Sequence, residues 1–455
     1  MNNKGLVIDF FAGGGGASTG IEKALGRPID LAINHDPDAI RLYKTNHPDT
    51  LCVTEDIFEV DILKHTKGKH VYLLWASPDC TSHSKAKGGQ PREKGLRVLP
   101  WAVYKHVKKI MPDMIFMENV EEIQEWGPLD EIGQPIKSLK GEDYKKFINA
   151  MKSLGYEFES RELIAADYGA PTTRNRWYGI FKRDGNKIIW PEATHNKLGI
   201  EGLKKWEPIS KYMDWDDLGS SIFTRKRPLK DKTLNRIARG IDKFIIKSDN
   251  PYILPDDKAA SFLIQYHSET KSEYVRGQSL NEPIKTIDTS NRYGLVTAFI
   301  TKFYRTGTGQ TVNEPIHTIT TSPGHFGLVS AFLIKYYGSG TGQSVNEPIG
   351  TIVTKDRFGL VTVMINGETY QIVDIWFRML KPEELKLGQG FPKEYIIDHD
   401  YLGKRYPISK RVARIGNSVV PIMSRTLVSI NISENELIDQ GLLISYESKF
   451  TLEKR

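Results

Sequence analysis

The segment that decides the fold reads Val71-Tyr-Leu-Leu-Trp-Ala-Ser-Pro-Asp-Cys-Thr-Ser-His-Ser-Lys85. Its first five residues are aliphatic or aromatic, a composition typical of a buried strand. We expect the strand to end by Pro78, because proline has no amide hydrogen to donate to a sheet. Cys80 would then lie on a loop just beyond the carboxyl end of the strand. In open α/β sheets, ligands bind at that edge.

Cys80 is therefore a candidate nucleophile. Lys85 and Lys87 follow it closely, and a nearby cation favours the reactive thiolate form of cysteine. A lone cysteine is more often a small buried apolar residue. The catalytic interpretation consequently depends on finding suitable partners elsewhere in the chain.

The composition is that of an ordinary globular protein. The chain has 455 residues, of which 39% are hydrophobic and 26% charged, which indicates two or three domains. A formal charge of +7 permits an acidic partner such as nucleic acid without requiring one. Two cysteines, Cys52 and Cys80, cannot build a disulfide framework. No stretch is apolar enough to cross a membrane, and Asp9 interrupts any signal-like run. We expect a cytoplasmic protein.

The amino-terminal segment predicts a strand, a glycine turn and a helix. Leu6–Phe11 is apolar except for Asp9, Ala12–Gly16 is rich in glycine, and Ala17–Leu25 has a helical pattern. Such an arrangement lets the backbone approach a nucleotide-like ligand at a helix amino terminus. Asp9 would repel phosphate, so a cofactor with a cationic or hydroxyl-bearing group fits better.

Polar residues follow several predicted parallel strands. Further strands are expected at 30–34 and 114–117, and the residues of interest are Asp9, Asn34, Asp56, Cys80 and Glu118. Right-handed crossovers would bring all these strand ends to one edge of one sheet. The first third of the chain thus predicts a doubly wound α/β fold with a site at that edge.

A second polar cluster contains Arg174 and Arg176, just before the predicted strand 177–181. Because side chains alternate along an extended segment, both arginines should share one face. Two guanidinium groups there could orient Glu118 and hold an anionic or carbonyl-bearing substrate. Taken alone, the pair would equally suit a solvated edge strand.

These residues occur in the order found in one enzyme family. The ordered motifs are Asp9-Phe-Phe-Ala-Gly-Gly-Gly-Gly16, the Cys80 loop, Glu118-Asn-Val120, Arg174-x-Arg176 and Gly416-Asn-Ser-Val-Val-Pro421. The chain resembles the cytosine-5 DNA methyltransferases over 1–180 and again near 375–430. Its Ser-Pro-Asp-Cys loop is similar to that of a branch common in bacteriophages and prophages. The resemblance implies a Rossmann-like S-adenosylmethionine-dependent methyltransferase sheet with a smaller β-rich target-recognition domain.

The resemblance also implies a role for each catalytic candidate. The Cys80 thiolate would add to carbon 6 of a cytosine flipped out of duplex DNA, while Glu118 hydrogen-bonds or protonates N3. Arg176 would stabilise the adduct, and Arg174 would set the geometry. S-adenosylmethionine would supply the methyl group for carbon 5.

The cofactor site implied by the resemblance draws on five parts of the chain and includes no metal. The expected residues are Asp9, Phe11, Ala12, Gly13, Gly15, Asn34, His35, Asp56, Ile57, Pro78, Asn417 and Ser418. Three positions differ from the usual family pattern: Asp79 replaces a proline before the nucleophile, Asn34 stands where a ribose-binding Glu is usual, and Thr172 replaces a Gln. The Asp79 charge would raise the pKa of Cys80 unless it is paired.

The middle of the chain reads differently. Nine Lys or Arg lie between Arg225 and Lys247 against two Asp, on a segment that predicts an amphipathic helix. Its basic face is either a solvated surface or a phosphate contact. Asn-Glu-Pro-Ile then occurs at 281, 313 and 346, each time followed by Thr-Ile and Gly-Leu-Val. This period predicts stacked β units in which Asn-Glu-Pro is a turn and the residues after it a half-buried strand.

We therefore predict a catalytic domain over 1–185, a target-recognition domain over 186–400 with repeats near 265–365, a return to the catalytic domain over 401–432, and a tail over 433–455. Most repeat residues would be scaffold, with base contacts confined to the glycine-rich tips. We expect a monomer that acts on double-stranded DNA, with a cognate restriction endonuclease as a candidate partner. The alternatives are the same chemistry on RNA or with another one-carbon donor, and a non-catalytic DNA-binding regulator.

Overall fold

A computed structural model describes residues 5–78, 99–254, 259–266, 276–302, 332–335, 343–344, 358–360, 362–365 and 368–432. The chain forms two compact units. The first unit contains Met1–Glu207, Pro283–Ser290 and Leu385–Arg455, and the second contains Pro208–Glu282 and Asn291–Glu384. Cys80, Asp79, the Asn-Glu-Pro-Ile segments at 313 and 346 and the tail after 432 lie outside the described residues.

The first unit is built on a seven-stranded sheet with the order β3-β2-β1-β4-β5-β7-β6. Its strands are β1 (Leu6–Phe10), β2 (Leu31–Ile33), β3 (Leu51–Val53), β4 (Val71–Ala76), β5 (Met114–Asn119), β6 (Glu157–Ile164) and β7 (Asn175–Lys182). The first five strands are parallel, whereas β7 and β6 are antiparallel to their neighbours. The predicted α/β, Rossmann-like sheet is confirmed.

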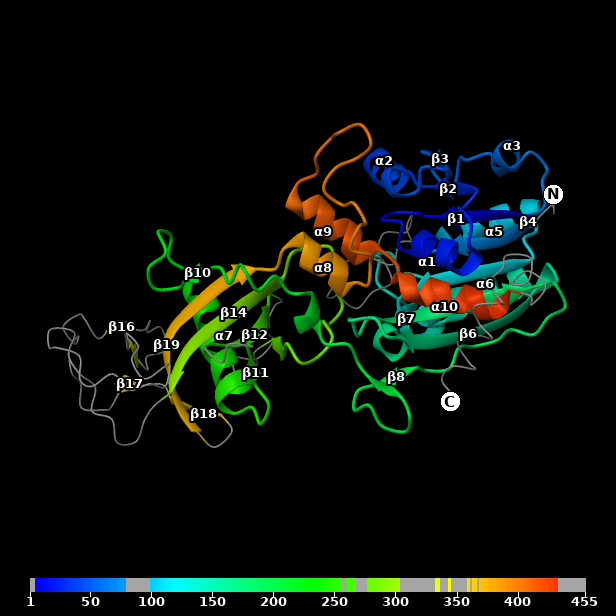
Figure 1. The fold of residues 1–455 in the computed structure, drawn as a ribbon. Coiled ribbons are helices and arrows are strands. Elements are labelled where there is room, and N and C mark those ends of the chain that lie inside the picture. The colour runs from blue at the N-terminus through cyan, green and yellow to red at the C-terminus, as the bar shows by residue number, and fades with distance from the viewer. Residues whose placement is uncertain are drawn as a thin grey trace, which may run out of the picture. The chain divides into compact units, whose positions relative to one another are not determined.

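Helices cover both faces of this sheet (Figure 1). Helices α1 (Gly16–Leu25) and α10 (Pro421–Asn431) pack on one face. Helices α5 (Leu99–Ile110) and α6 (Glu142–Ser153) pack on the other. Burial on both faces explains why β4 and β5 are nearly continuous apolar runs rather than alternating ones.

The first unit contains further helices in the segments between and after its strands. They are α2 (Pro37–Asn46), α3 (Ile62–Thr66) and α9 (Ile408–Asn417), and the short 3-10 helices are Glu121–Glu125, Lys137–Leu139 and Ala165–Tyr168. Helix α2 begins where the sequence favours it: Asp36 accepts a hydrogen bond from the amide of Asp38, and Pro37 occupies the first turn. Strands β8 (His195–Asn196) and β9 (Lys204–Lys205) form a separate two-stranded ribbon.

The second unit is an antiparallel β structure. Its main sheet has the order β10-β19-β14-β12-β11, with β13 and β18 paired at the side. The strands are β10 (Ser220–Ser221), β11 (Tyr252–Ile253), β12 (Ala259–Gln265), β13 (Gly277–Ser279), β14 (Tyr293–Lys302), β18 (Thr362–Ile365) and β19 (Glu368–Met379). A smaller sheet joins β15 (Phe332–Lys335), β16 (Gln343–Ser344) and β17 (Phe358–Leu360).

The predicted basic helix is α7 (Asp231–Ile241), which packs on this sheet. Ile237 and Ile241 are buried, whereas Arg239 and Lys243 are exposed, as the amphipathic pattern predicts. Arg236 instead lies over the ring of Tyr266, with 4.8 Å between the guanidinium carbon and the ring centroid. The helix extends through a π-helical turn (Asp242–Ile246). The short helix Ile209–Tyr212 lies near the start of this unit, and α8 (Pro382–Gly388) begins in this unit and ends in the first.

The first repeat departs from its prediction. The expected turn is present near Asn281, but the half-buried strand expected after it is absent from the described part of this repeat. Ile284 makes only an isolated bridge to Thr172, and the segment Pro283–Ser290 belongs to the first unit. The reason is that the Ile284 amide donates to the Pro171 carbonyl at 2.9 Å, and the Thr173 amide donates back to the Ile284 carbonyl at 2.9 Å. The first unit thus binds the backbone groups that a strand of the repeat would need for pairing.

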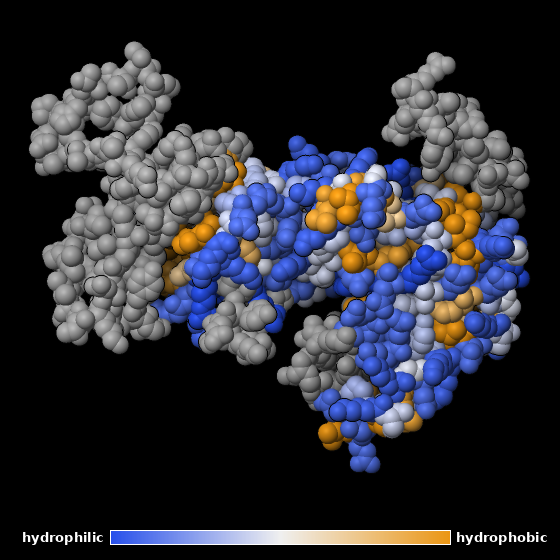
Figure 2. Space-filling model, turned by 90° about the horizontal axis from the view of Figure 1, so that it is seen from below, coloured by the Kyte–Doolittle hydropathy of each residue, from blue (hydrophilic) through white to orange (hydrophobic). Residues whose placement is uncertain are grey.

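No helix in the described ranges is long and apolar enough to span a membrane. On the face shown in Figure 2, hydrophilic residues cover most of the described surface, and hydrophobic residues form separate patches between them. Such scattered apolar exposure is ordinary for a globular protein.

Candidate active site

Glu118, Arg174 and Arg176 converge on one face of the first unit's sheet. Glu118 is in β5, and the neighbouring antiparallel strand β7 begins at Asn175, between the two arginines. Arg176 Nε lies 3.3 Å from Glu118 Oε1, and Arg174 Nη2 lies 3.9 Å from the same oxygen. The structure therefore brings together the carboxylate and both guanidinium groups that the sequence singled out.

The two arginines have different surroundings. Arg174 is 5% exposed, and its Nη1 lies 2.9 Å from the Gly416 carbonyl and 3.5 Å from the Ile287 carbonyl. These contacts join β7 to α9 and to the captured repeat segment. Arg176 instead donates to its neighbour, the Asn175 carbonyl, at 2.7 Å. Arg174 thus links Glu118 to two distant backbone segments, whereas the hydrogen bond of Arg176 is to its own neighbour in the sequence.

The carboxyl group of Glu118 retains hydrogen-bonding capacity. Its Oε1 is buried and accepts no hydrogen bond of good geometry from the described residues, although both arginines lie near it. Tyr178 lies on the adjacent strand, opposite Glu118. Burial, and secondarily the Glu118 charge, raises the pKa of Tyr178, so this hydroxyl stays neutral. A buried carboxyl group beside cations can bind or protonate a ring nitrogen.

Cys80 lies outside the described residues, but the start of its loop is described. Pro78 is buried, and its carbonyl accepts a hydrogen bond of 3.1 Å from Asn119 Nδ2. Asn119 Oδ1 accepts from the Val120 amide at 2.9 Å. Sequence reasoning assigned no role to Asn119. Asn119 could have been identified from the sequence as a polar residue at the end of a predicted strand, directly after Glu118.

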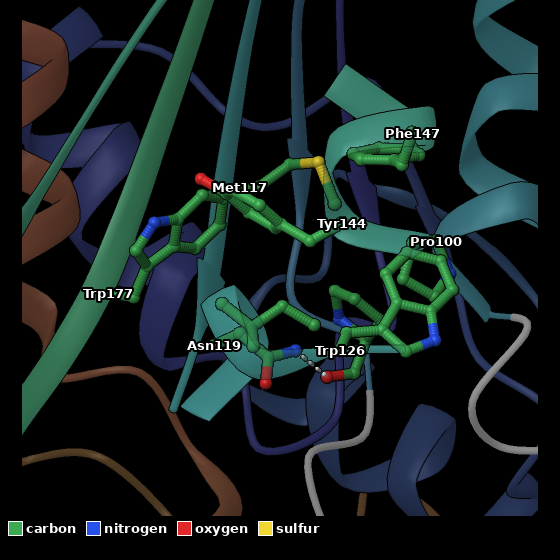
Figure 3. Close-up of a pocket in the computed structure, with 9 residues that line it drawn as sticks. Pro100, Met117, Asn119, Trp126, Tyr144, Phe147 and Trp177 are labelled. Carbon is green, nitrogen blue, oxygen red and sulfur yellow. Dashed lines mark hydrogen bonds between the residues drawn. The ribbon is translucent and has the colours of Figure 1, made fainter. Parts of the chain in front are cut away.

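A pocket lies on the opposite face of β5 from Glu118 (Figure 3). Met117 and Asn119 point into it from the strand, because side chains alternate across a sheet. The lining residues are Pro78, Pro100, Met117, Asn119, Ile123, Trp126, Tyr144, Phe147 and Trp177. The rings around the pocket pack on one another, with 6.1 Å between the centroids of Trp101 and Trp126. This apolar wall supports the strand that carries Glu118 and the start of the Cys80 loop.

The glycine turn after β1 is tightly folded. Phe11 has a φ of 64°, which is unusual for a bulky residue. The Gly13 amide donates to the Phe11 carbonyl at 2.7 Å, and the Gly15 amide donates to the Ala12 carbonyl at 3.1 Å. Gly14 allows close packing against α9, since a Cβ there would lie 2.1 Å from Ser418 Oγ. The turn therefore presents backbone rather than side chains at the start of α1.

Asp9 is the buried carboxyl group beneath this turn. Ser18 Oγ donates to Asp9 Oδ2 at 2.5 Å, and the Tyr43 hydroxyl donates to Ser18 Oγ at 2.7 Å. Burial raises the pKa of Asp9 to about 7, while the Ser18 hydrogen bond opposes the rise. Ser18 and Tyr43 were missed in the sequence because each looks like an ordinary helical residue.

The candidates after β2 and β3 occupy the same edge of the sheet. Asn34 Oδ1 accepts from the Asp36 amide at 2.8 Å, which orders the loop before α2. His35 is exposed. Asp56 is exposed, and its Oδ1 accepts from the Phe58 amide at 2.8 Å. Ile57 is buried, and its carbonyl lies 2.6 Å from His106 Nε2.

The late motif approaches the glycine turn from α9. Asn417 is exposed at the end of α9, whereas Ser418 is buried. Asn417 and Ser418 do not cap the next helix, because Val420 is the N-cap residue of α10. Ser418 is the C-cap residue of α9, and its Oγ donates to the Arg414 carbonyl at 2.7 Å. Ser418 therefore finishes one helix rather than starting another.

Glu118 lies earlier than predicted relative to its strand: it is inside β5 and not beyond it, because the ladder continues to Asn119, with Glu118 opposite Tyr178. Asp9 is inside β1, within the strand predicted over 6–11, so it precedes the end of that strand. In the described ranges, no group of three or more His, Cys, Asp or Glu side chains could hold a metal ion.

Comparison with known proteins yields related sequences. The model of the C-5 cytosine-specific DNA methylase family matches residues 6–430. The Type II methyltransferase M1.HphI of Haemophilus parahaemolyticus is 26% identical over 59% of this chain and 70% of its own length. The Type II methyltransferase M.AquIA of Picosynechococcus sp. is 30% identical over 42% of this chain and 76% of its own length.

Among solved structures, the Dnmt2 methyltransferase of S. pombe shares 13% identity, covers 94% of this chain and 100% of its own, and has a TM-score of 0.48. The family match spans both the Glu118 cluster and the glycine turn, and continues through α9 to α10. The chain therefore belongs to the C-5 cytosine-specific DNA methylase family, and it is a DNA cytosine-5 methyltransferase.

Proposed function

We propose that the protein transfers a methyl group from S-adenosylmethionine to carbon 5 of a cytosine flipped out of double-stranded DNA, through a covalent Cys80 adduct at carbon 6. The observation that carries this proposal is the convergence of Glu118, Arg174 and Arg176, with Arg176 Nε 3.3 Å from Glu118 Oε1. The start of the Cys80 loop is anchored next to them through Asn119.

The glycine turn suits the proposed cofactor. Helix α1 begins at Gly16 with no side-chain cap, so its first-turn amides can bind a carboxylate such as that of the methionyl group. Asp9 supplies a carboxyl group beneath the turn, which suits a cationic ligand better than a phosphate. Asn34, His35 and Asp56 lie on loops after β2 and β3, where they could hold the ribose and the base. When bound, S-adenosylmethionine supplies an electrophilic methyl group.

The residues of the chain would prepare the cytosine for that electrophile. Carbon 5 is a weak nucleophile while the ring is aromatic. The Cys80 thiolate forms a bond to carbon 6, and a proton from Glu118 reaches N3, so electron density moves to carbon 5. Arg176 stabilises the charge around the ring, while Arg174 keeps Glu118 and α9 in place. After methylation, a water molecule acting as base takes the proton from carbon 5, Cys80 leaves carbon 6 as the thiolate, and N3 returns its proton to Glu118.

The proposed attack requires the base to leave the helix. A thiolate at carbon 6 and a methyl donor at carbon 5 must reach the ring faces, which are stacked inside a duplex. The exposed cations Arg239 on α7 and Lys243 on the π-helical turn after it could contact phosphates of the same duplex. The names of M1.HphI and M.AquIA support a cognate restriction endonuclease as a partner of this chain too.

The first test is bisulfite sequencing of DNA from cells that express the protein, which should reveal one methylated sequence context. A duplex with 5-fluorocytosine in that context should then form a covalent complex with the wild type but not with Cys80→Ala, because fluorine cannot leave carbon 5 as a proton does. Trapping by both proteins would exclude the Cys80 adduct. Trapping on RNA of the same sequence, and not on DNA, would favour the RNA alternative.

A further inference from the structure

A chain of three side chains lies beneath the glycine turn, and none of them belongs to the predicted site. The Tyr395 hydroxyl donates to the Gly14 carbonyl at 2.8 Å. The same hydroxyl lies 3.3 Å from His47 Nε2, and His47 Nδ1 lies 2.8 Å from Glu22 Oε2. The three residues come from the segment between α8 and α9, the end of α2, and α1. All of them belong to the first unit.

The glycine turn packs closely against Tyr395 and His47. Gly15 has a φ of 76°, a left-handed conformation that favours glycine. A Cβ on Gly15 would lie 2.2 Å from the Tyr395 hydroxyl oxygen and 2.9 Å from His47 Nε2. A larger residue at position 15 would clash with both of these side chains, so glycine there lets the Tyr395 hydroxyl lie directly against the turn backbone.

The contacts fix the orientation of the turn's peptide planes. Tyr395 holds the Gly14 carbonyl, and Thr19 Oγ1 donates to the Gly15 carbonyl at 2.7 Å. Each carbonyl shares a peptide plane with the next amide, so these two bonds also fix the amides of Gly15 and Gly16. The Gly15 amide closes the turn on the Ala12 carbonyl, and Gly16 is the first residue of α1. The shape of the turn and the direction of the first amide of α1 therefore depend on these hydrogen bonds.

His47 and Tyr395 are buried, and the Tyr395 hydroxyl is a suitable donor for the Gly14 carbonyl. The side chain of His47 is 2% exposed, and Tyr395 is buried. Burial raises the pKa of Tyr395 well above its ordinary value, so the hydroxyl remains a donor at any physiological pH. A carbonyl that lost this donor would be left unsatisfied in the interior, which is costly.

We infer that Tyr395, backed by His47 and Glu22, is a positioning residue that holds the glycine turn in the shape that binds the methyl donor. The inference rests on the proposed function, because it assumes that S-adenosylmethionine binds at this turn. Tyr395 does not touch the reacting atoms. Its loss should weaken donor binding without affecting the affinity for DNA.

The test compares two buried tyrosines of the same connecting segment. Tyr395→Phe removes the hydroxyl that holds Gly14. The matched control is Tyr406→Phe, because the Tyr406 hydroxyl donates to Asp400 Oδ2 at 2.7 Å, lies 3.2 Å from the Asp38 carbonyl oxygen and does not contact the turn. Titration calorimetry with S-adenosylhomocysteine should show binding weakened about tenfold in Tyr395→Phe. Tyr406→Phe should stay within about twofold of the wild type, although both variants lose a buried hydrogen bond.

Kinetics gives a second measurement. Tyr395→Phe should raise the KM for S-adenosylmethionine and leave the KM for DNA unchanged, and a purely structural role would not produce that split. Equal effects of the two substitutions on S-adenosylhomocysteine binding, or no effect of either, would overturn the inference alone. Absence of binding by the wild type would instead refute the proposed donor, and the inference with it.

Discussion

Asp9 and Glu118 are buried carboxyl groups at the same edge of one sheet, yet they have opposite surroundings. Glu118 faces two guanidinium groups, at 3.3 Å from Arg176 and 3.9 Å from Arg174. Asp9 faces hydroxyl groups, receiving a hydrogen bond from Ser18, which in turn receives one from Tyr43. The negative charge of Glu22 raises the pKa of Asp9 further.

The difference shows how one fold provides two kinds of carboxyl group. At the β5 end, the antiparallel strand β7 delivers cations to the carboxylate, and a charged substrate ring can be handled there. At the β1 end, hydroxyl groups satisfy Asp9 without neutralising it, and burial raises its pKa to about 7. Such a group gains from a cationic ligand.

The largest expected effect is on catalysis at the β5 end. Glu118→Gln keeps the shape but removes the acidic proton, and we expect methyl transfer to fall by about 10³-fold, within the range for loss of a general acid. Incorporation of a labelled methyl group into DNA would measure it. The control is Glu157→Gln, an exposed carboxylate on β6, which should leave activity unchanged. Near-normal activity of Glu118→Gln would remove Glu118 from the proposed mechanism.

The two arginines should differ in stability. Arg174→Ala leaves the Gly416 carbonyl and Glu118 short of a partner in the interior, so we expect the free energy of unfolding to fall by about 3 kcal/mol. Arg176→Ala should cost about 1 kcal/mol, because Arg176 is more exposed and its hydrogen bond is local. Urea denaturation of both variants measures the difference. Equal losses would show that the carbonyl contacts of Arg174 contribute little.

At the β1 end, the expected effect depends on pH. The pKa of Asp9 is about 7 in the folded chain against 3.8 as its ordinary value, so the folded state holds the proton more tightly. The contribution of Asp9 to the free energy of unfolding is greatest near pH 4 and falls by roughly 4 kcal/mol as pH rises to 7, then levels off. Asp9→Asn removes this contribution.

Urea denaturation between pH 4.5 and 8 tests this expectation. The free energy of unfolding of Asp9→Asn, relative to that of the wild type, should rise from pH 4.5 to about pH 7 and level off above it. A constant difference between the two proteins would mean that Asp9 is ionised throughout, like a carboxylate with a cationic partner.

Sequence patterns predicted the sheet because its signals are local. The apolar runs at β1, β4 and β5 are strands under any arrangement, and their order with intervening helices requires parallel pairing. The same rule places Asp9, Asn34, Asp56 and Glu118 at one edge. Arg174 and Arg176 were predictable as a pair because alternation in an extended segment fixes their shared face.

The contacts that complete each site were not predictable, because they join distant segments. Tyr395 meets Gly14 across 381 residues, and Arg174 meets Gly416 across 242 residues. Nothing local marks such pairs. The repeat at Asn281 was misread for the same reason: its pattern suits a strand, but Pro171 and Thr173 of the first unit bind the backbone of Ile284.

The smallest expected effect compares the Tyr43 hydroxyl, which is linked to Asp9 through Ser18, with a tyrosine hydroxyl that bonds only to a backbone carbonyl. Tyr43→Phe removes the donor to Ser18, so Ser18 can stabilise ionised Asp9 less well. We expect a loss of about 1 kcal/mol in the free energy of unfolding at pH 8, and a smaller loss at pH 5, where Asp9 is protonated. The control is Tyr156→Phe, whose hydroxyl donates to the Pro112 carbonyl at 2.6 Å, far from Asp9 in the sequence. Its loss should not vary with pH, since both partners are uncharged throughout this range. If the Tyr43→Phe loss were equally constant, Tyr43 would have no influence on the charge of Asp9, and the contrast with Glu118 would rest on Ser18 alone.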